Sequence, residues 1–186
     1  MTILITGASL IGTHLSKSLI DKEEIPIVLD ISPQLEAIGT ILDLNKIKII
    51  YHDILDFEFI VKIVKDNEVK CIIHTTANPL LNVGAQEDPL NSIKINTIGT
   101  ANILEASRKL DVNKVIFISS ATLYTNKREI NEYGKLSEEN VTRKTNIYIT
   151  TKLACENIGI NYSELYGLDF ISLRPAGVFG PWLGKG

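Results

Sequence analysis

Cysteine, histidine, methionine and tryptophan are all scarce in this sequence. The only two cysteines among its 186 residues, Cys71 and Cys155, lie far apart and fit no metal-ligand spacing. Cys71 falls in an apolar run typical of a strand, and Cys155 falls in a segment with helical periodicity. We therefore expect two small buried thiols in a reducing compartment and no metal site.

Positive charge is not in surplus either. Lysine and arginine total 19 against 22 acidic residues, giving a net charge of -3, and the basic residues form no patch. This balance argues against a nucleic-acid partner. No apolar run approaches the length of a membrane span, and Met1 leads directly into the strand-like residues 2–5 rather than into a signal peptide. We expect a soluble cytoplasmic protein without a membrane partner.

Short apolar, β-branched runs alternate with longer segments of helical periodicity. The expected strands are Thr2–Thr6, Ile25–Asp30, Ile47–Tyr51, Val69–His74, Lys114–Ser119 and Asp169–Arg174. The expected helices are Ile11–Lys22, Glu36–Leu44, Glu58–Asn67, Ser92–Leu110 and Asn146–Gly167, and the polar segment Asn126–Thr145 is expected to be a surface loop. Nearly continuous apolar strands are typical of a sheet covered on both faces. The pattern predicts one α/β domain over residues 1–186, with a doubly wound parallel sheet of six strands of the Rossmann type.

A glycine-containing turn joins the first strand to the first helix. Gly7 and Gly12 flank this turn, so the backbone can approach a pyrophosphate at the N-terminus of the helix. Asp30 ends the second strand, 23 residues after Gly7, close to the spacing at which a carboxylate binds a ribose 2′-hydroxyl. Residues 31–35 contain no Arg or Lys to receive a 2′-phosphate. The sequence favours NAD over NADP, although Asp30 is also a common residue type in a turn after a strand.

Three polar side chains could form a catalytic set. Ser119 and Ser120 end the fifth strand, where a doubly wound sheet presents its ligand crevice. Tyr148 and Lys152 are four residues apart and so share one face of a helix. A phenol with a pKa of about 10 becomes a usable base when a neighbouring ammonium and a nicotinamide ring favour the phenolate. Tyr148 could then take a proton from a substrate hydroxyl while hydride leaves the same carbon for NAD.

The segment from Thr6 to Leu15 resembles the opening T-G-x-x-G-F-I-G-S-H-L of the extended short-chain dehydrogenases/reductases, which are NAD-dependent epimerases and dehydratases. Here the turn is one residue shorter and lacks the middle glycine. A turn of this length could bind the pyrophosphate through the amides of Ala8, Leu10 and Ile11, or it could weaken cofactor binding. The resemblance also favours Ser120 over Ser119 as the catalytic serine, because Ser120 lies four residues before Tyr124.

Other segments add to the resemblance. Asp53-Ile54 resembles the pair that contacts adenine. Asp is also a favoured helix N-cap residue, and the two roles are compatible. The segment from His74 to Ala77 resembles the family's H-L-A-A, which implies cofactor contacts at Thr75 and Ala77. We expect His74 itself to be structural.

Asn96 matches the family's N-x-x-G-T, which implies a place in the cofactor site, although it could be an ordinary solvent-facing helix residue. The resemblance also implies a homodimer formed through the helices bearing Asn96 and Tyr148. A simpler expectation for the apolar residues near Asn96 is that they face the chain's own sheet. These residues are Ile93, Ile95, Ile98, Ile103 and Leu104.

The resemblance covers essentially all 186 residues and implies an NAD-dependent epimerase or dehydratase that acts on a nucleotide sugar. Members of this branch usually continue into a substrate domain, so the chain is expected to be the N-terminal part of a longer protein, with Trp182 beside the substrate mouth. Two alternatives stay open: an NAD-dependent alcohol dehydrogenase of a small hydroxy acid or hydroxy amino acid, and a dinucleotide-binding sensor without turnover. Substrate trials and cofactor titration separate them.

Overall fold

The computed structural model describes residues 1–78, 87–124, 138 and 146–184. Six parallel strands form one sheet in the order β3-β2-β1-β4-β5-β6. Their bounds are Ile3–Thr6 (β1), Ile27–Asp30 (β2), Lys48–Tyr51 (β3), Cys71–His74 (β4), Lys114–Ile118 (β5) and Asp169–Leu173 (β6). In the register, Ile5 of β1 lies between Val28 of β2 and Ile73 of β4. The predicted six-stranded Rossmann sheet is therefore confirmed.

The helices alternate with these strands as the periodicity predicts. They are Leu10–Ile20 (α1), Leu35–Gly39 (α2), Phe57–Asp66 (α3), Pro89–Ile93 (α5), Gly99–Lys109 (α6) and Ile147–Tyr166 (α7). Short 3-10 turns occupy Leu44–Lys46 (η1) and Ala121–Tyr124 (η3), and a π-helical turn occupies Lys94–Ile98 (η2). No helix in the described ranges is both long and apolar enough to cross a membrane. The loop predicted at 126–145 lies outside the described residues except for Glu138.

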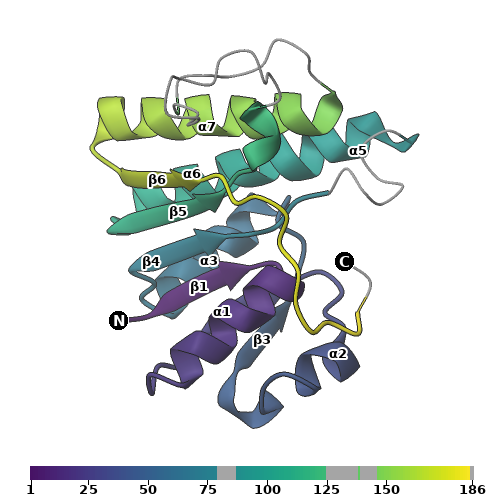
Figure 1. Ribbon diagram of the computed structural model, residues 1–186. Coiled ribbons are helices and arrows are strands. Elements are labelled where there is room, and N and C mark those ends of the chain that lie inside the picture. The colour runs from purple at the N-terminus through teal and green to yellow at the C-terminus, as the bar shows by residue number, and fades with distance from the viewer. Residues whose placement is uncertain (79–86, 125–137, 139–145, 185–186) are drawn as a thin grey trace.

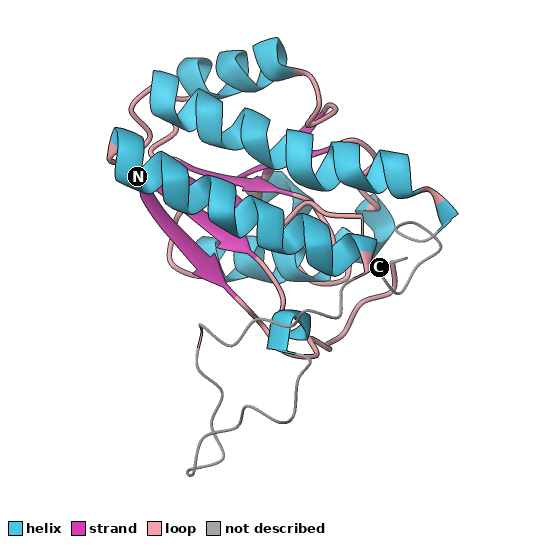
Figure 2. Cartoon of the chain, turned by 90° about the horizontal axis from the view of Figure 1, so that it is seen from above, coloured by secondary structure: helices cyan, strands magenta, loops and turns pink. Residues whose placement is uncertain are grey.

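Two apolar clusters cover the two faces of the sheet. On one face, residues of α3 and α6 such as Ile60, Ile103 and Leu104 pack on Leu4 and Ile72 with no exposed surface. On the other face, α1 and α2 cover a smaller cluster. Figure 1 shows α1 in front of the sheet and α3 behind it, and Figure 2 shows the helical layers from above. Both faces of the central strands β1, β2 and β4 are buried, which is why these strands are apolar without alternation. The edge strand β6 is open on one face, where Ile171 and Leu173 are 37% and 47% exposed.

The chain reverses its direction of winding at the centre of the sheet. From β1 it moves outward through β2 to β3, and it then returns to β4 on the other side of β1 and continues to β6. The loops that follow β1 and β4 therefore diverge to opposite faces and leave a crevice at the carboxyl ends of these strands. Such a switch point is where ligands bind in open α/β sheets.

One predicted helix is shorter than expected. The periodicity predicts a helix over 36–44, but α2 ends at Gly39 and a separate 3-10 turn follows at Leu44–Lys46. The Asp43 side chain accepts a hydrogen bond from the Asn45 backbone N–H and so starts the new turn. Local side-chain bonding of this kind competes with helix continuation.

The helix predicted over Ser92–Leu110 is interrupted by the π-helical turn η2. The wider turn points Ile93 and Ile98 outward, with 42% and 50% of their surface exposed, whereas Ile103 and Leu104 are fully buried. The expectation that all the apolar residues here face the sheet is therefore wrong for Ile93 and Ile98. A π-turn inserts one extra residue and shifts the helical face, which a regular 3.6-residue period does not anticipate.

Candidate active site

The turn between β1 and α1 is built around two glycines. Gly7 has a φ of +89°, and a Cβ there would lie 2.8 Å from Oγ1 of Thr75. A Cβ on Gly12 would overlap the carbonyl oxygen of Gly7. Any side chain at either position would push the turn away from α1 and from the loop after β4. The turn is thus closed by backbone-to-backbone contact, as a close approach to a phosphate requires.

Asp30 is held against this turn by backbone amides. Its Oδ2 accepts a hydrogen bond from the Ala8 N–H at 2.7 Å, and its Oδ1 accepts one from the Ser32 N–H at 2.8 Å. The Ala8 amide is therefore engaged within the protein, so its predicted contact with a pyrophosphate would require it to leave Asp30. Asp30 is at once a turn residue and a residue that lines the crevice.

The first turn of α1 faces the crevice with Leu10 and Ile11. Amides in the first turn of a helix have no acceptor within the helix, and the Ser9 side chain makes no capping hydrogen bond to them. Free amides at the positive end of a helix bind anions. In this shortened turn, the amides that remain open to an anion are those at the start of α1.

Two adjoining pockets follow the carboxyl ends of the strands. A larger pocket of about 720 Å³ and a smaller one of about 440 Å³ are both lined by Asp30, Ile31, Ala77 and Asn78. These four shared residues make the two pockets parts of one groove. An elongated groove that crosses the switch point fits a dinucleotide, with one nucleotide in each half.

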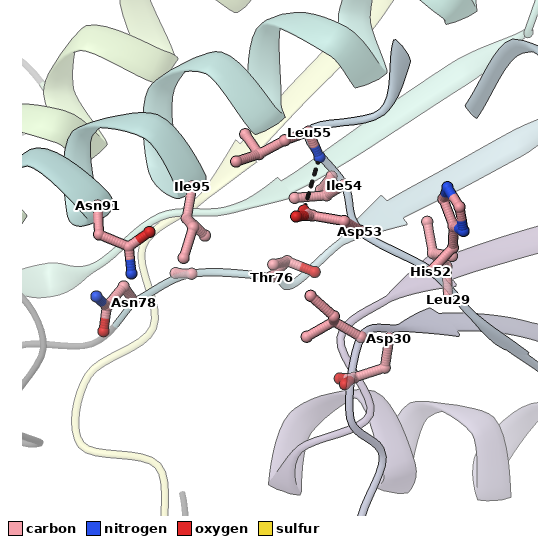
Figure 3. A pocket seen from close by; sticks show the side chains of 12 residues that line it. Leu29, Asp30, His52, Asp53, Ile54, Leu55, Thr76, Asn78, Asn91 and Ile95 are labelled. Atoms are coloured by element: carbon pink, nitrogen blue, oxygen red, sulfur yellow. Dashed lines mark hydrogen bonds between the residues drawn. The ribbon is translucent and has the colours of Figure 1, made fainter. Parts of the chain in front are cut away.

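The smaller pocket contains Asp53 and Ile54 (Figure 3). Oδ1 of Asp53 accepts a hydrogen bond from the Leu55 N–H at 2.9 Å. The N-cap of α3 is Asp56, whose side chain accepts from the Phe59 N–H. The alternative that Asp53 caps this helix is therefore wrong, and its carboxylate stands in the pocket wall, as the adenine prediction requires.

The loop after β4 separates the two halves of the groove. Thr75 lines the larger pocket, and Ala77 and Asn78 line both. The Asn78 N–H donates to Oδ1 of Asn96 at 2.7 Å, and Nδ2 of Asn96 donates to Oγ1 of Thr151 at 3.0 Å. Asn96 is 2% exposed and lines neither pocket, so it is not a solvent-facing residue. It ties this loop to α7, and in the described part of the chain it acts by positioning other residues.

His74 belongs to the core rather than to the groove. Thr6 Oγ1 lies 2.6 Å from its Nδ1, and Thr100 Oγ1 lies 2.9 Å from its Nε2. The Thr100 hydroxyl donates to the Asn96 carbonyl oxygen, so it accepts from His74, and His74 in turn accepts from Thr6. Burial lowers the pKa of His74 to about 3, with a smaller effect of the Lys152 charge, so the ring is neutral. This bonding agrees with the structural role expected for His74.

The three predicted catalytic residues meet in the larger pocket. Ser120, Tyr148 and Lys152 all line it. The Ser120 hydroxyl accepts hydrogen bonds from the Thr122 N–H at 3.2 Å and from the Thr122 hydroxyl at 2.9 Å. Nζ of Lys152 donates to the carbonyl oxygen of Ile118 at 2.6 Å and lies 5.8 Å from the centre of the Tyr148 ring. The Asn146 side chain accepts from the Ile149 N–H and so caps α7, which begins one residue before Tyr148.

Burial governs the protonation of this set. It lowers the pKa of Lys152 to about 8, against smaller opposing effects of Cys155 and Glu156. Burial also raises the pKa of Tyr148, and the hydrogen bond from Ser120 offsets this only in part. The predicted lowering of the phenol pKa is therefore not produced by the chain alone, because the Lys152 ammonium is bonded to a carbonyl oxygen instead of the phenol.

The sequence reasoning missed several residues of the groove. Asn78 lines both pockets and directly follows the segment His74–Ala77, so its place after β4 was available as a signal. Asn91 and Ile95 reach the smaller pocket from α5 and η2, and nothing in the local pattern marks them (Figure 3). Trp182 lines the larger pocket, as expected for a residue at the substrate mouth.

Comparison with known proteins agrees with this geometry. A family model described as the NAD dependent epimerase/dehydratase family matches residues 3–186. The chain belongs to this family. The cofactor of the family is NAD, in agreement with the choice that Asp30 indicates.

Among curated epimerase/dehydratase relatives, the UDP-glucose 4-epimerase of Halalkalibacterium halodurans is 34% identical over 176 residues, which cover 94% of this chain and 50% of the relative. Among solved structures, the UDP-glucose 4-epimerase of Thermus thermophilus in complex with NAD superposes with a TM-score of 0.81 at 27% identity, over 94% of this chain and 54% of that one. The Thermotoga maritima enzyme with UDP-glucose gives a TM-score of 0.84 at 26% identity, over 99% and 58%. This epimerase/dehydratase chain spans about half the length of these relatives.

Proposed function

We propose that this chain forms the cofactor-binding half of an enzyme that acts on a nucleotide sugar through transient oxidation at a sugar carbon. The observation that carries the proposal is the shared lining of the larger pocket. Ser120, Tyr148 and Lys152 line it together with the first turn of α1 and with Asp30. An anion site and an acid–base set in one pocket are what a dinucleotide and an alcohol substrate require.

The groove fits NAD along its length. The amides of Leu10 and Ile11 would hold the pyrophosphate, Asp30 the adenosine ribose, and Asp53 with Ile54 the adenine. The tight closure around Gly7 and Gly12 supports this placement, since a Cβ at either glycine would obstruct the turn. Bound NAD supplies a hydride acceptor at the substrate carbon.

The chain's own side chains would handle the proton and the substrate oxygen. Tyr148 would take the proton from the substrate hydroxyl, and Ser120 would orient that oxygen and stabilise its developing charge. Lys152 is 3% exposed, and its Nζ donates to the Ile118 carbonyl oxygen. This side chain would bind the nicotinamide ribose. Because burial raises the pKa of Tyr148, phenolate formation would depend on positive charge brought beside it by the bound cofactor and by Lys152.

The nucleotide-sugar assignment draws on the relatives. Several are UDP-sugar 4-epimerases by name, and one solved relative holds UDP-glucose. The activity of the whole protein, its homodimeric state and its cytoplasmic location are part of this proposal. The exposed Ile93 and Ile98 near the helix that bears Asn96 support the dimer.

The test uses the complete natural protein with NAD and a panel of UDP- and dTDP-sugars. An epimerase converts the sugar without net reduction of NAD, whereas a hydroxy-acid or hydroxy-amino-acid dehydrogenase accumulates reduced nicotinamide. The Tyr148→Phe variant should lose roughly 10²- to 10⁴-fold in kcat and retain NAD binding. Full activity in Tyr148→Phe would contradict the proposal.

The shortened glycine turn favours one rival, a sensor that binds NAD without turnover. The Ala8 amide is already engaged by Asp30, so fewer donors remain for the pyrophosphate. Calorimetry with NAD and NADP addresses this directly. Binding of NAD by the complete protein, without conversion of any sugar or hydroxy acid in the panel, would favour the sensor.

A further inference from the structure

A buried ion pair lies directly behind the proposed catalytic set. Glu156 stands four residues after Lys152 in α7 and is 3% exposed. Its two carboxylate oxygens accept from Nε and Nη2 of Arg174 at 2.9 and 2.6 Å, and one of them also accepts from the Ser172 hydroxyl at 2.9 Å. Two parallel hydrogen bonds between a guanidinium and a carboxylate fix the relative orientation of the groups that carry them.

The backbone around Arg174 is hydrogen-bonded to the backbone around Ser120. The carbonyl oxygen of Leu173, just before Arg174, accepts from the Ser119 N–H at 2.7 Å. The carbonyl oxygen of Pro175, just after it, accepts from the Ala121 N–H at 2.9 Å. The residues on each side of Ser120 are therefore bonded to the residues on each side of Arg174. The position of Ser120 follows that of the Arg174 backbone.

Arg174 makes a second contact on the serine side. Its guanidinium lies 4.9 Å from the centre of the Tyr124 ring, at the end of the 3-10 turn that begins directly after Ser120. The same guanidinium thus contacts both ends of the arrangement: the helix that carries Tyr148 and Lys152, through Glu156, and the turn that follows Ser120, through Tyr124.

We propose that the Glu156–Arg174 pair sets the position of Ser120 relative to Tyr148 and Lys152, so that both are positioning residues for the reaction. The inference rests on the proposed function of these three side chains. The Lys152–Ile118 bond already joins α7 to the end of β5. The bidentate pair between α7 and the segment after β6 is a second link, and it reaches both residues that flank Ser120. Neither Glu156 nor Arg174 lines the larger pocket, so neither acts on the substrate itself.

The charge of Glu156 gives the role a distinct signature. Lys152 faces Tyr148, Cys155 and Glu156 on α7 and the neutral His74 on β4. Burial raises the pKa of the Cys155 thiol, which stays protonated at neutral pH. Glu156, whose pKa is lowered despite burial by its bonds to Arg174, Ser119 and Ser172, is therefore the anion whose charge favours the ammonium form of Lys152. Replacing it with Gln removes that charge and leaves the Arg174 cation, so Lys152 should lose its proton at lower pH.

The experiment compares Glu156→Gln, Arg174→Lys and a control, Glu105→Gln, in the complete protein with NAD and the sugar it converts. Glu105 makes a bidentate pair with Arg108 on α6, at 2.7 and 2.8 Å, far from the groove. In Glu156→Gln and Arg174→Lys, kcat should fall roughly ten- to a hundredfold with little change in KM or in NAD affinity. Glu105→Gln should keep the wild-type kcat.

The pH profile separates positioning from loss of stability. Glu156→Gln should shift the alkaline limb of the kcat–pH profile to lower pH. Arg174→Lys keeps both charges but loses the bidentate hydrogen bonds, and it should leave that limb in place. All rates are measured well below the lowest melting temperature of the set. Wild-type kcat in both variants, or an unmoved alkaline limb in Glu156→Gln, would overturn the inference.

If the wild-type protein converts no nucleotide sugar, the proposed function fails, and the inference is then tested without turnover. Amide resonances of residues 119–121 and the Lys152 side-chain titration, followed by NMR, should both shift in Glu156→Gln and stay unchanged in Glu105→Gln. Unchanged resonances at residues 119–121 would show that the pair does not position Ser120.

Discussion

Single residues decide whether the turn after β1 can hold a phosphate. Gly7 adopts a left-handed backbone conformation, and Gly12 leaves no room for a methyl group beside the Gly7 carbonyl oxygen. The one amide removed from the expected donors, that of Ala8, is removed by one carboxylate, that of Asp30. A pyrophosphate bound at this turn would thus depend on a few backbone amides, and the contacts at Gly7 and Gly12 leave their positions little tolerance.

Gly12→Ala should destabilise the protein by about 1–3 kcal/mol, because the added methyl group forces α1 away from the turn. NAD affinity should fall with it, since the amides of Leu10 and Ile11 move. Urea unfolding and calorimetry measure the two effects. The control is Gly39→Ala at the end of α2, where the nearest atom to a new Cβ is 3.7 Å away. That variant should be neutral or slightly stabilising, and equal losses in both variants would contradict the argument.

His74 should make the stability of the protein depend on pH. Its folded-state pKa of about 3 lies below the ordinary value of 6.5, because burial disfavours the charged ring. Above pH 6.5 the ring is neutral in both states, and the full stability is present. As pH falls from 6.5 toward 3, only the unfolded chain takes up the proton, so the free energy of unfolding decreases by up to about 1.4 kcal/mol per pH unit.

Urea unfolding at a series of pH values measures this dependence. Wild type and His74→Gln are compared, since carboxylates contribute to both curves and the difference isolates the ring. The variant should be less stable at pH 7 and lose less stability on acidification. An identical slope in the two proteins between pH 6.5 and 4 would show that His74 does not titrate in this way.

At the scale of elements, α7 carries two of the three proposed catalytic groups and begins one residue before the first of them. The Asn146 side chain accepts from the Ile149 N–H at 2.9 Å. Gly167 ends the helix in a left-handed conformation with φ of 72°. Tyr148 lies in the first turn, where helices fray, so the cap bears directly on the phenol position.

Asn146→Ala should therefore cost about 0.5–2 kcal/mol of stability and lower kcat more than it lowers NAD affinity. Asn146→Ser replaces one good capping residue with another and should remain close to wild type. Thermal unfolding and steady-state kinetics on both variants provide the comparison. A loss of the same size in Asn146→Ser would indicate that the asparagine acts in some way other than capping.

Sequence periodicity predicted all six strands because each is short, apolar and bounded by polar residues. It predicted the ends of α7 because Asn146 and Gly167 are standard start and stop residues. It could not predict the end of α2 at Gly39, which depends on the competing turn at Asp43. Nor could it predict the π-turn before Gly99, because that turn holds one more residue than an α-helical turn and no residue type marks it.

The site was predictable to the same extent. The sequence predicted that Ser120, Tyr148 and Lys152 lie together because strand ends and i,i+4 spacing are local signals. The doubly wound topology places the carboxyl ends of the strands at one crevice. The bond between Ala8 and Asp30, the contribution of Asn91 to the smaller pocket, and the Lys152–Ile118 bond arise from packing between distant segments. Such contacts leave no mark in a single sequence.

At the scale of the whole molecule, the reversal of winding between β1 and β4 places all these residues along one groove. The same architecture leaves apolar side chains on the outer surface. Ile93 and Ile98 are 42% and 50% exposed beside the helix that bears Asn96. Exposed apolar residues at a helix surface are typical of contact with another protein chain.

Light scattering on the complete protein should show a homodimer, and Ile98→Glu should convert it to a monomer because a charge replaces apolar contact area. Ile25→Glu is the matched control, since Ile25 is 72% exposed in the segment before β2. That variant should remain dimeric. A wild-type monomer at all concentrations, or a dimer in both variants, would contradict the predicted interface.

The π-helical turn at Lys94–Ile98 has one more consequence. Because a π-turn holds an extra residue, removing any one residue from it would restore a regular α-helix and rotate everything before it by about 100°. Ser92 would then turn away from Asn78, and Asn91 and Ile95 would leave the smaller pocket. Insertions and deletions at this place should therefore change which side chains line the smaller pocket while the sheet stays intact. The π-turn thus sets the rotation of the preceding helix relative to the groove.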